Sequence, residues 1–289
     1  MKSGKLVLGG AQFGMPYGVT NTNGTPTDQI SRALLDVAYD AGIDMIDTAP
    51  AYGESEVVLG RLNAGTRFSF ITKTLASGGA PDVKAMVSQF HRSLSRLRQQ
   101  TITGMLFHDA DLLVSDAGNV LFEAALGFKR DGLVEKLGVS VYSTEQIDAL
   151  LAKFEIDLVQ LPINLLDKRL IVSGALDRLK NRGIEVHARS AFLQGVLLST
   201  PENLPEKVAR LRPYIYQYRK RLAELNLSPV QGCLGFLQSM ESIDRIVVGV
   251  TSVSELKEIL AGIDCTVTCN AFSDLAIEDA SLIDPRFWE

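Results

Sequence analysis

The chain has 289 residues and a formal net charge of −5; 46% of its residues are hydrophobic and 22% are charged. This composition supports a large buried core and excludes a disordered chain, while the acidic balance argues against an extended basic surface for nucleic acid or anionic lipid. No apolar run approaches the ~20 residues of a membrane span, and the start lacks a signal-peptide segment. We therefore expect a cytoplasmic protein whose partners are small molecules.

Eight short apolar runs alternate with helical segments along the chain. In chain order they lie at residues 6–8, 45–46, 68–71, 105–107, 137–139, 158–161, 184–186 and 246–248. After the third run, apolar residues recur three and four apart from Val83 to Leu97, which predicts an amphipathic helix. Short buried strands that alternate with such helices indicate βα units. Eight units predict a (β/α)₈ barrel over residues 1–289 as a single domain.

Two further patterns refine this arrangement. Ser143-x-x-Gln146 and Ser252-x-x-Glu255 fit a capping box, in which two side chains satisfy backbone N–H groups at a helix start. The interval between the seventh and eighth runs is the longest, and it predicts an extra helix over 206–225 before a helix over 230–240. Two interpretations of the extra helix stay open: a wall of a substrate pocket or a solvated packing helix.

Polar residues follow the second, third and fourth runs. Asp47 and Tyr52 follow the second run, Lys73 the third and His108 the fourth. Active sites of (β/α)₈ barrels lie at the carboxyl ends of the strands, so these residues are catalytic candidates. Taken singly, each residue has a structural alternative. Asp47 could cap a turn, Tyr52 could be an aromatic residue at the rim, Lys73 a solvated charge and His108 a hydrogen-bonded core histidine. Their order on successive strands favours catalysis.

The segment from Asp47 to Gly53 reads Asp-Thr-Ala-Pro-Ala-Tyr-Gly. It resembles the Asp-x-Ala-x-x-Tyr-Gly motif of the aldo-keto reductase family, and with Lys73 and His108 it resembles the catalytic tetrad of that family. The segments Gly-Ala-Gln-Phe-Gly and Arg-Ser-Ala-Phe-Leu-Gln-Gly look like a bacterial branch often associated with the metabolism of surface-polysaccharide sugars, which implies a sugar or nucleotide-sugar carbonyl as substrate.

The resemblance implies a division of labour among the four residues. Carbonyl reduction needs a hydride on carbon and a proton on oxygen, and Tyr52 would donate the proton. Lys73 would lower the pKa of Tyr52, and Asp47 would keep the buried Lys73 charged. His108 would hold the substrate oxygen in line with Tyr52. No role follows for the other two histidines, His91 and His187.

A nicotinamide cofactor is implied by the same resemblance. Its contacts would come from the first strand, from the ends of the fifth and sixth strands, from the loop after the seventh strand and from the loop after the eighth. The matching residues are Gly10, Ser140, Gln160, Arg189, Ser190, Leu193, Gln194, Gly195, Gly249, Thr251, Ser252 and Glu255. Backbone N–H groups at the start of a helix attract phosphate, which suits the last of these loops.

Four positions depart from the family pattern. Val141 and Ile259 each replace a common Asn, and Arg189 replaces a stacking aromatic residue that often precedes the serine of the seventh strand. Glu255 replaces a basic residue that binds the 2′-phosphate of NADP(H), although it also fits the capping box. A carboxylate repels phosphate and can accept from a ribose hydroxyl. NADP(H) follows from the resemblance, and NAD(H) stays open because of Glu255.

The sequence thus predicts an NAD(P)(H)-dependent oxidoreductase that reduces an aldehyde or ketone. Two alternatives stay open: a weakly catalytic sensor or subunit that binds the cofactor, and a barrel lyase in which Lys73 forms a Schiff base. The oligomeric state, the direction of reaction and the carbonyl compound stay open as well.

The cysteines and the C-terminal tail add two smaller expectations. Cys233, Cys265 and Cys269 form no Cys-x-x-Cys pair and the chain has three histidines, so no metal site is expected. The tail, residues 284–289, has two possible placements: over the mouth of the barrel, or with Phe287 and Trp288 against the outer helices.

Overall fold

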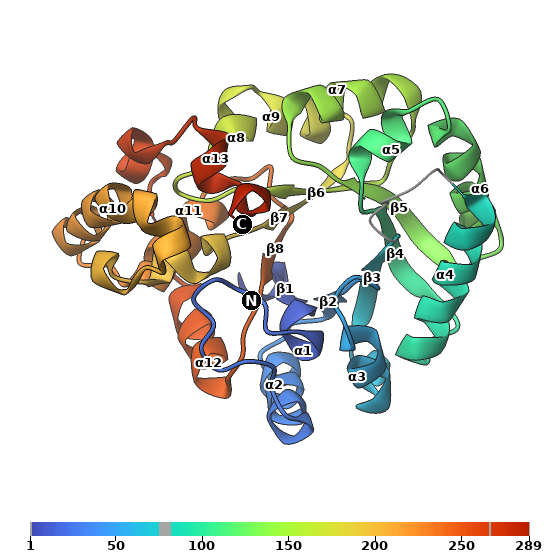
Figure 1. Ribbon diagram of the computed structural model, residues 1–289, viewed down its shortest axis with the longest axis horizontal. Coiled ribbons are helices and arrows are strands. Elements are labelled where there is room, and N and C mark those ends of the chain that lie inside the picture. Colours follow the sequence, from blue (N-terminus) through green and yellow to red (C-terminus); the bar gives the residue numbers. More distant parts are fainter. Residues whose placement is uncertain (1, 75–81, 266, 289) are drawn as a thin grey trace.

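Eight parallel strands form a closed barrel in which neighbouring strands follow chain order (Figure 1). The computed structural model describes residues 2–74, 82–265 and 267–288. The strands are β1 (Leu6–Gly9), β2 (Met45–Asp47), β3 (Ser69–Lys73), β4 (Ile102–Phe107), β5 (Val134–Ser140), β6 (Leu158–Pro162), β7 (Glu185–Arg189) and β8 (Arg245–Val248). All eight predicted runs overlap these strands, and the predicted barrel is confirmed.

Helices surround the barrel (Figure 1). In the described parts of the chain they are α1 (Ala11–Gly14), α2 (Asp28–Asp40), α3 (Ser55–Arg61), α4 (Val83–Leu97), α5 (Ala110–Val114), α6 (Gly118–Arg130), α7 (Thr144–Lys153), α8 (Arg169–Val172), α9 (Ala175–Asn181), α10 (Arg212–Glu224), α11 (Pro229–Gln238), α12 (Val253–Gly262) and α13 (Ala280–Ile283). Their buried faces pack on the outward-facing strand residues and form one large apolar core.

The inside of the barrel contains a separate apolar layer. Successive strand residues point to opposite sides, and the buried cluster that is distinct from the outer core consists of Val7, Met45, Ile71, Leu106 and Leu158, with Val247 packed against it. Two glycines make room for this layer. A Cβ on Gly104 would lie 2.4 Å from Ile71, and one on Gly138 would lie 2.7 Å from Leu106. We refer to these six apolar side chains as the apolar layer.

The extra helix between β7 and β8 is present. The predicted span 206–225 contains the 3₁₀ segment Glu206–Leu211 followed by α10, and the predicted helix over 230–240 corresponds to α11. Arg219 of α10 donates to the carbonyl oxygens of Leu198 and Ser199, which fixes the helix to the preceding loop. No α10 residue lines the cavity described below, so α10 is a packing helix.

The two predicted capping boxes mark helix starts correctly, but in each only one of the two expected hydrogen bonds forms. Ser143 accepts from the N–H of Gln146, and Ser252 accepts from the N–H of Glu255. The return bond is displaced by one residue, because the Gln146 side chain accepts from the N–H of Tyr142 rather than that of Ser143. Glu255 likewise binds the residue before its cap.

The C-terminal tail combines both predicted placements. Trp288 is 7% exposed and packs into the core, whereas Phe287 is 61% exposed. Arg286 lies against the ring of Tyr142, which follows β5 at the mouth of the barrel, with 3.4 Å between its guanidinium carbon and the ring centre. Asp284 is buried and binds Arg286 through both carboxylate oxygens.

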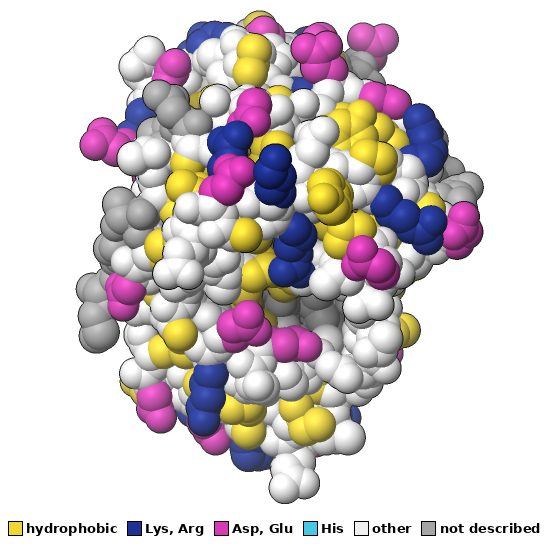
Figure 2. All heavy atoms as spheres, turned by 90° about the vertical axis from the view of Figure 1, so that its left-hand side faces the viewer, with side chains coloured by type: hydrophobic (Ala, Val, Ile, Leu, Met, Phe, Trp, Pro, Cys, Tyr) yellow, Lys and Arg dark blue, Asp and Glu magenta, His cyan; other side chains and the backbone are white. Residues whose placement is uncertain are grey.

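Basic and acidic side chains are interspersed on the face shown in Figure 2. In the described part of the chain, no helix is long and apolar enough to cross a membrane. Within the same residues, no group of three His, Cys, Asp or Glu side chains is placed to hold a metal ion.

Candidate active site

A layer of polar side chains lies directly above the apolar layer, at the carboxyl ends of the strands. Side chains two residues apart on a strand point to the same side. The residues two positions after four members of the apolar layer therefore also point inward, at the mouth of the barrel. They are Asp47 after Met45, Lys73 after Ile71, His108 after Leu106 and Gln160 after Leu158. The same alternation places Ser140 of β5 and Arg189 of β7 there. The strand register thus gathers six of the predicted site residues.

Asp47 and Lys73 form a buried ion pair. The Lys73 ammonium donates to both carboxylate oxygens of Asp47 at 2.7 Å and to the carbonyl oxygen of Thr48 at 3.1 Å. These bonds occupy all three N–H groups of the ammonium. Gln160 donates to Asp47 at 2.8 Å, so its amide nitrogen is also engaged. Burial lowers the pKa of Lys73, and the negative charge of Asp47 opposes that change.

Tyr52 lies in the turn between β2 and α3, beside Lys73. The ammonium nitrogen of Lys73 is 5.0 Å from the centre of the Tyr52 ring. Burial raises the pKa of Tyr52 well above its usual range, and the charge of Asp47 raises it further, while Arg189 lowers it. The expected lowering of this pKa by Lys73 is wrong, because burial and the charge of Asp47 raise the pKa of Tyr52 and the hydrogen bonds of Lys73 go to Asp47 and Thr48. Tyr52 is therefore a neutral phenol at neutral pH.

The turn that contains Tyr52 packs on the backbone of the first strand's loop. A Cβ on Gly14 would lie 1.9 Å from the carbonyl oxygen of Tyr52, and a Cβ on Gly53 would lie 2.4 Å from that of Gly14. Gly53 also has a φ of +57°, in the left-handed region. Ser55 donates to the carbonyl oxygen of Gly10 at 2.7 Å. The two segments can approach this closely only because both contact positions are glycine.

His108 follows β4 and faces Tyr52. The two rings meet edge to face with centres 6.2 Å apart. Burial, and then the positive charge of Lys73, lower the pKa of His108 from 6.5 to about 4. The imidazole is therefore neutral at neutral pH. Its Nδ1 atom is buried and has no hydrogen-bond partner in the described part of the chain.

A cavity of about 440 Å³ opens above these residues. All four tetrad candidates line it, as do most of the predicted cofactor residues: Gly10, Ser140, Gln160, Arg189, Ser190, Gln194, Gly195, Gly249, Thr251 and Glu255. Two predicted cofactor residues do not. Leu193 is fully buried, and Ser252 caps α12. The strand register and the loops therefore bring together both the catalytic and the cofactor candidates of the sequence.

The segment after β7, residues 190–195, is strained where it borders the cavity. Ser190, Leu193 and Gln194 have φ values of +60°, +48° and +53°, and Gly195 has +90°. Left-handed conformations are costly for residues other than glycine and cluster at ligand-binding sites. Asn164 supports the turn by donating to the carbonyl oxygen of Ser190 at 3.2 Å. We call this segment the β7 loop.

At the start of α12, the carboxylate of Glu255 occupies the backbone and side-chain donors of the turn. It accepts from the N–H of Thr251 at 2.6 Å and from the Thr251 hydroxyl at 2.9 and 3.0 Å. The N–H of Glu255 itself is taken by Ser252. This helix start is therefore less available to a phosphate group than the sequence predicts.

The segment between α1 and α2, residues 15–27, crosses the cavity between these two loops. Asn23 donates to the Thr251 hydroxyl at 2.9 Å. Thr20 donates to the carbonyl oxygen of Gln194, and Gln194 donates to the hydroxyl of Tyr17, both at 3.3 Å. The sequence analysis did not single out these lining residues, although the turn-rich run Asn21-Thr-Asn-Gly24 marks a loop there.

Tyr142 and Gln12 are two further lining residues that the sequence analysis missed. Tyr142 lies against the guanidinium groups of both Arg189 and Arg286, at 4.1 and 3.4 Å from its ring centre. The amide oxygen of Gln12 is buried without a hydrogen-bond partner among the described residues. Their sequence signal was position alone, since Gln12 follows β1 closely and Tyr142 follows β5.

Comparison with known proteins identifies the family of the chain. The family model described as the aldo/keto reductase family matches residues 5–276. The chain is 27% identical over 275 residues to L-glyceraldehyde 3-phosphate reductase of Escherichia coli O157:H7, covering 78% of this chain and 77% of that protein. It is 26% identical over 280 residues to D-arabinose 1-dehydrogenase of Saccharomyces cerevisiae, covering 87% and 80%.

A solved structure supports the fold independently. The structure of an aldo-keto reductase from Bacillus halodurans in its holo form superposes with a TM-score of 0.78, at 19% identity, over 99% of this chain and 95% of that one.

Proposed function

Since the chain belongs to the aldo/keto reductase family and is an oxidoreductase, we propose that it reduces the carbonyl group of a small aldehyde or ketone with NAD(P)H. One observation supports this most directly. Tyr52 and His108 face each other above the buried pair of Asp47 and Lys73, in one cavity that also contains the predicted cofactor residues.

In this proposal Tyr52 is the proton donor. The nicotinamide, when bound, supplies the hydride to the carbonyl carbon. The O–H bond of Tyr52 breaks and its proton goes to the carbonyl oxygen, leaving a phenolate beside the cationic side chains of Lys73 and Arg189. The neutral His108 ring donates an N–H to the same oxygen and orients it. Asp47 holds the Lys73 ammonium in place without touching the substrate.

The residues present fit a nicotinamide cofactor. The amide oxygen of Gln12 and the Nδ1 atom of His108 are buried polar atoms that lack partners among the described residues, which suits a polar ligand. Ser140 and the amide oxygen of Gln160 would hold the carboxamide, and the β7 loop would hold the pyrophosphate. These assignments include Gly10, Gln194, Gly195, Gly249 and Thr251 as contacts of the cofactor.

We propose that the cavity accepts NADH at least as well as NADPH. Glu255 places a negative charge at the helix start where the 2′-phosphate of NADPH would lie, and it occupies the Thr251 donors. A carboxylate can instead accept from the ribose hydroxyl of NADH. Leu193 and Ser252 would act through the backbone shape of their loops, since their side chains do not line the cavity.

A sugar-type carbonyl is the substrate class that the relatives favour. Two of them are named for L-glyceraldehyde 3-phosphate and D-arabinose. The geometry disfavours a Schiff-base lyase, because every N–H of Lys73 is engaged and its side chain is buried. We also propose that the chain acts as one barrel domain, since one core cluster extends from Leu6 to Trp288, and that it works in the cytoplasm, since Cys233 and Cys265 are free.

The test is turnover with both cofactors. Purified protein should consume NADH or NADPH in the presence of short aldehydes and aldose sugars, measured by absorbance and by identification of the alcohol product. Stoichiometric cofactor binding without turnover across that panel would instead support a cofactor-binding sensor or subunit. Absence of both binding and turnover would contradict the proposal.

A further inference from the structure

The charges around the reacting end of the cavity do not cancel. Asp47 and Lys73 neutralise each other, and His108 is neutral because its pKa is lowered to about 4. The carboxylate of Glu255 lies at the start of α12 and is engaged with Thr251. Arg189 is the remaining charge at the reacting end, and within the described residues it forms no ion pair with a carboxylate. The inner part of the cavity therefore carries a net positive charge.

Two neutral oxygen atoms are the hydrogen-bond partners of Arg189. One terminal nitrogen donates to the carbonyl oxygen of Val141 at 3.3 Å, and the other donates to the Ser190 hydroxyl at 3.5 Å. Both distances are long for such bonds. A guanidinium has five N–H groups, so most of its donors stay available, in a planar fork that matches a carboxylate or phosphate.

Arg189 faces the reacting groups rather than the solvent. It lines the same cavity as Tyr52, Lys73 and His108, and its charge contributes to lowering the pKa values of all three. Arg189 lies two residues beyond His187, which is opposite Gln160 in the strand register, and its side chain lines the same cavity as Asp47 and Gln160. A ligand group bound by Arg189 would therefore lie next to the carbonyl that reacts.

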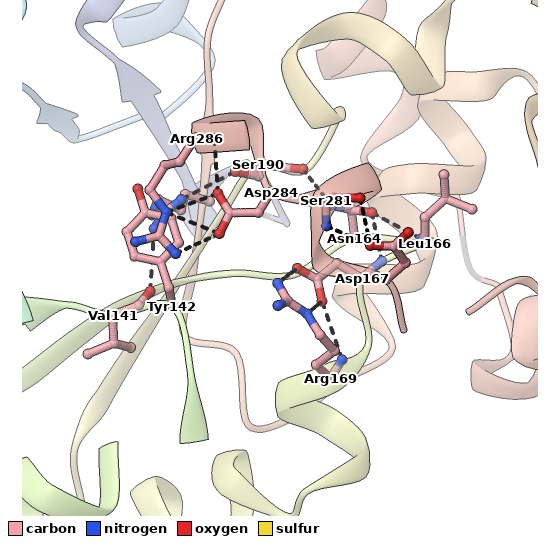
Figure 3. A network of polar contacts seen from close by, with 12 residues as sticks. Val141, Tyr142, Asn164, Leu166, Asp167, Arg169, Ser190, Ser281, Asp284 and Arg286 are labelled. Atoms are coloured by element: carbon pink, nitrogen blue, oxygen red, sulfur yellow. Dashed lines mark hydrogen bonds and ion pairs between the residues drawn. The ribbon is translucent and has the colours of Figure 1, made fainter. Parts of the chain in front are cut away.

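The neighbouring Arg286 is not a second site of the same kind. Its guanidinium donates to both carboxylate oxygens of Asp284, at 3.0 and 2.6 Å, so its charge is already compensated. Figure 3 shows this pair beside Tyr142, with Val141 and Ser190 close by. Because both guanidinium groups lie against the Tyr142 ring, Arg286 and Asp284 fix that ring, and the ring in turn supports Arg189.

We propose that Arg189 is a substrate-binding residue, and that the preferred substrates of this enzyme carry a carboxylate or phosphate group close to the reacting carbonyl. The inference rests on the proposed carbonyl reduction. A compact oxyanion would take the free N–H groups of Arg189 while the carbonyl oxygen lies between Tyr52 and His108. Such a charge-assisted bond selects anionic substrates over neutral ones of equal length.

The experiment compares matched aldehydes. Succinic semialdehyde and butanal differ by a carboxylate, and glyceraldehyde 3-phosphate and glyceraldehyde differ by a phosphate. We measure kcat/KM for each with both cofactors, in wild type, Arg189→Gln, Arg189→Lys and the control Arg178→Gln. Arg178 is an arginine on α9 that is paired with Asp148 outside the cavity. The two pairs separate a carboxylate site from a phosphate site.

We expect the anionic member of at least one pair to be preferred about tenfold or more in wild type. Arg189→Gln should reduce that ratio to near one, Arg189→Lys should retain part of it, and Arg178→Gln should retain all of it. In wild type, acetate or inorganic phosphate should inhibit the neutral aldehyde competitively. This last measurement needs no variant and therefore does not depend on how well the substituted proteins fold.

Three results would overturn the inference. Equal turnover of the anionic and neutral members would remove it and leave the proposed reductase intact. If Arg189→Gln leaves the ratio of kcat/KM for the anionic and neutral aldehydes unchanged but raises the dissociation constant of the cofactor, Arg189 binds the cofactor instead. If wild type binds the cofactor but turns over none of the four aldehydes, the proposed function itself is contradicted, and the substrate site with it.

Discussion

The ammonium of Lys73 lies 2.7 Å from both carboxylate oxygens of Asp47, and the side chains of the two residues are 1% and 5% exposed. A pair this deep in the barrel gains its stability from mutual compensation, because neither charge can turn to water. Substitution of one partner should therefore lower the free energy of unfolding more than substitution of both partners together.

Substitution of Asp47 should destabilise the fold more than removal of the whole pair. Asp47→Asn leaves a buried ammonium without its counter-charge, and we expect a loss of about 3 kcal/mol or more in the free energy of unfolding. The double variant Asp47→Asn/Lys73→Met should recover most of that loss. Urea denaturation measures both. A loss below about 1 kcal/mol for the single variant would mean that the pair is not charged.

Tyr52→Phe should abolish carbonyl reduction while cofactor binding persists. Removal of a general acid typically lowers the rate by about 10² to 10⁴-fold. The phenyl ring preserves the edge-to-face contact with His108, so the cavity keeps its shape. Steady-state kinetics and cofactor fluorescence separate the two effects. Turnover equal to wild type would show that another group donates the proton.

The stability of the protein should fall in mild acid because of His108. Its folded pKa is about 4 and its ordinary value is 6.5, so between these pH values the unfolded chain binds a proton that the folded protein does not. The free energy of unfolding is therefore fully retained above pH 6.5 and falls as the pH drops towards 4. His108→Gln should show a shallower fall. Denaturation curves measured at several pH values test this, and parallel slopes in the two proteins would refute it.

Glu255→Gln should shift cofactor preference towards NADPH. The substitution removes a negative charge at the start of α12 but keeps an oxygen that can accept from Thr251. We expect the ratio of NADPH to NADH affinity to rise about fivefold, which corresponds to about 1 kcal/mol. Glu258→Gln removes the same charge from an exposed position of the same helix and is the control. Equal shifts in both variants would mean that the effect is only the net charge.

Gly14→Ala should impair the fold around Tyr52. Its Cβ would lie 1.9 Å from the carbonyl oxygen of Tyr52, so the turn must move. We expect a lower melting temperature and a lower kcat. Gly127→Ala is the matched control, because a Cβ there meets only the tip of Arg130 at 4.0 Å within α6. That control should gain about 0.5 to 1 kcal/mol from helix propensity.

The barrel and the clustering of the tetrad candidates could be predicted from sequence because both depend on local patterns. Short apolar runs marked all eight strands, and strand order alone brings Asp47, Lys73 and His108 to one mouth. Periodicity also predicted α4 and the insertion before α11. These features follow from which residues are buried, and burial is what hydrophobic spacing records.

Individual hydrogen bonds were not predictable in the same way. The third N–H of Lys73 goes to the Thr48 carbonyl rather than to Tyr52, and Glu255 binds Thr251 rather than closing a box with Ser252. In both cases the possible hydrogen-bond partners are only one or a few residues apart, and the side-chain conformation determines which of them is bound. The contact of Arg286 with Tyr142 joins residues far apart in the chain, so no local pattern could indicate it.

The apolar layer beneath the site limits how protons can travel. Lys136, Glu185 and His187 form a second polar group inside the barrel, joined by hydrogen bonds, and His187 is opposite Gln160 in the strand register. Among the described residues no hydrogen bond joins this group to Lys73 or Asp47, and hydrocarbon side chains such as Ile71 and Leu158 cannot relay a proton between them. In the proposed reaction, Tyr52 would then take up its next proton from the solvent side, through the opening that the reactants themselves fill. Release of the product and reprotonation of Tyr52 would thus take place through the same opening of the cavity.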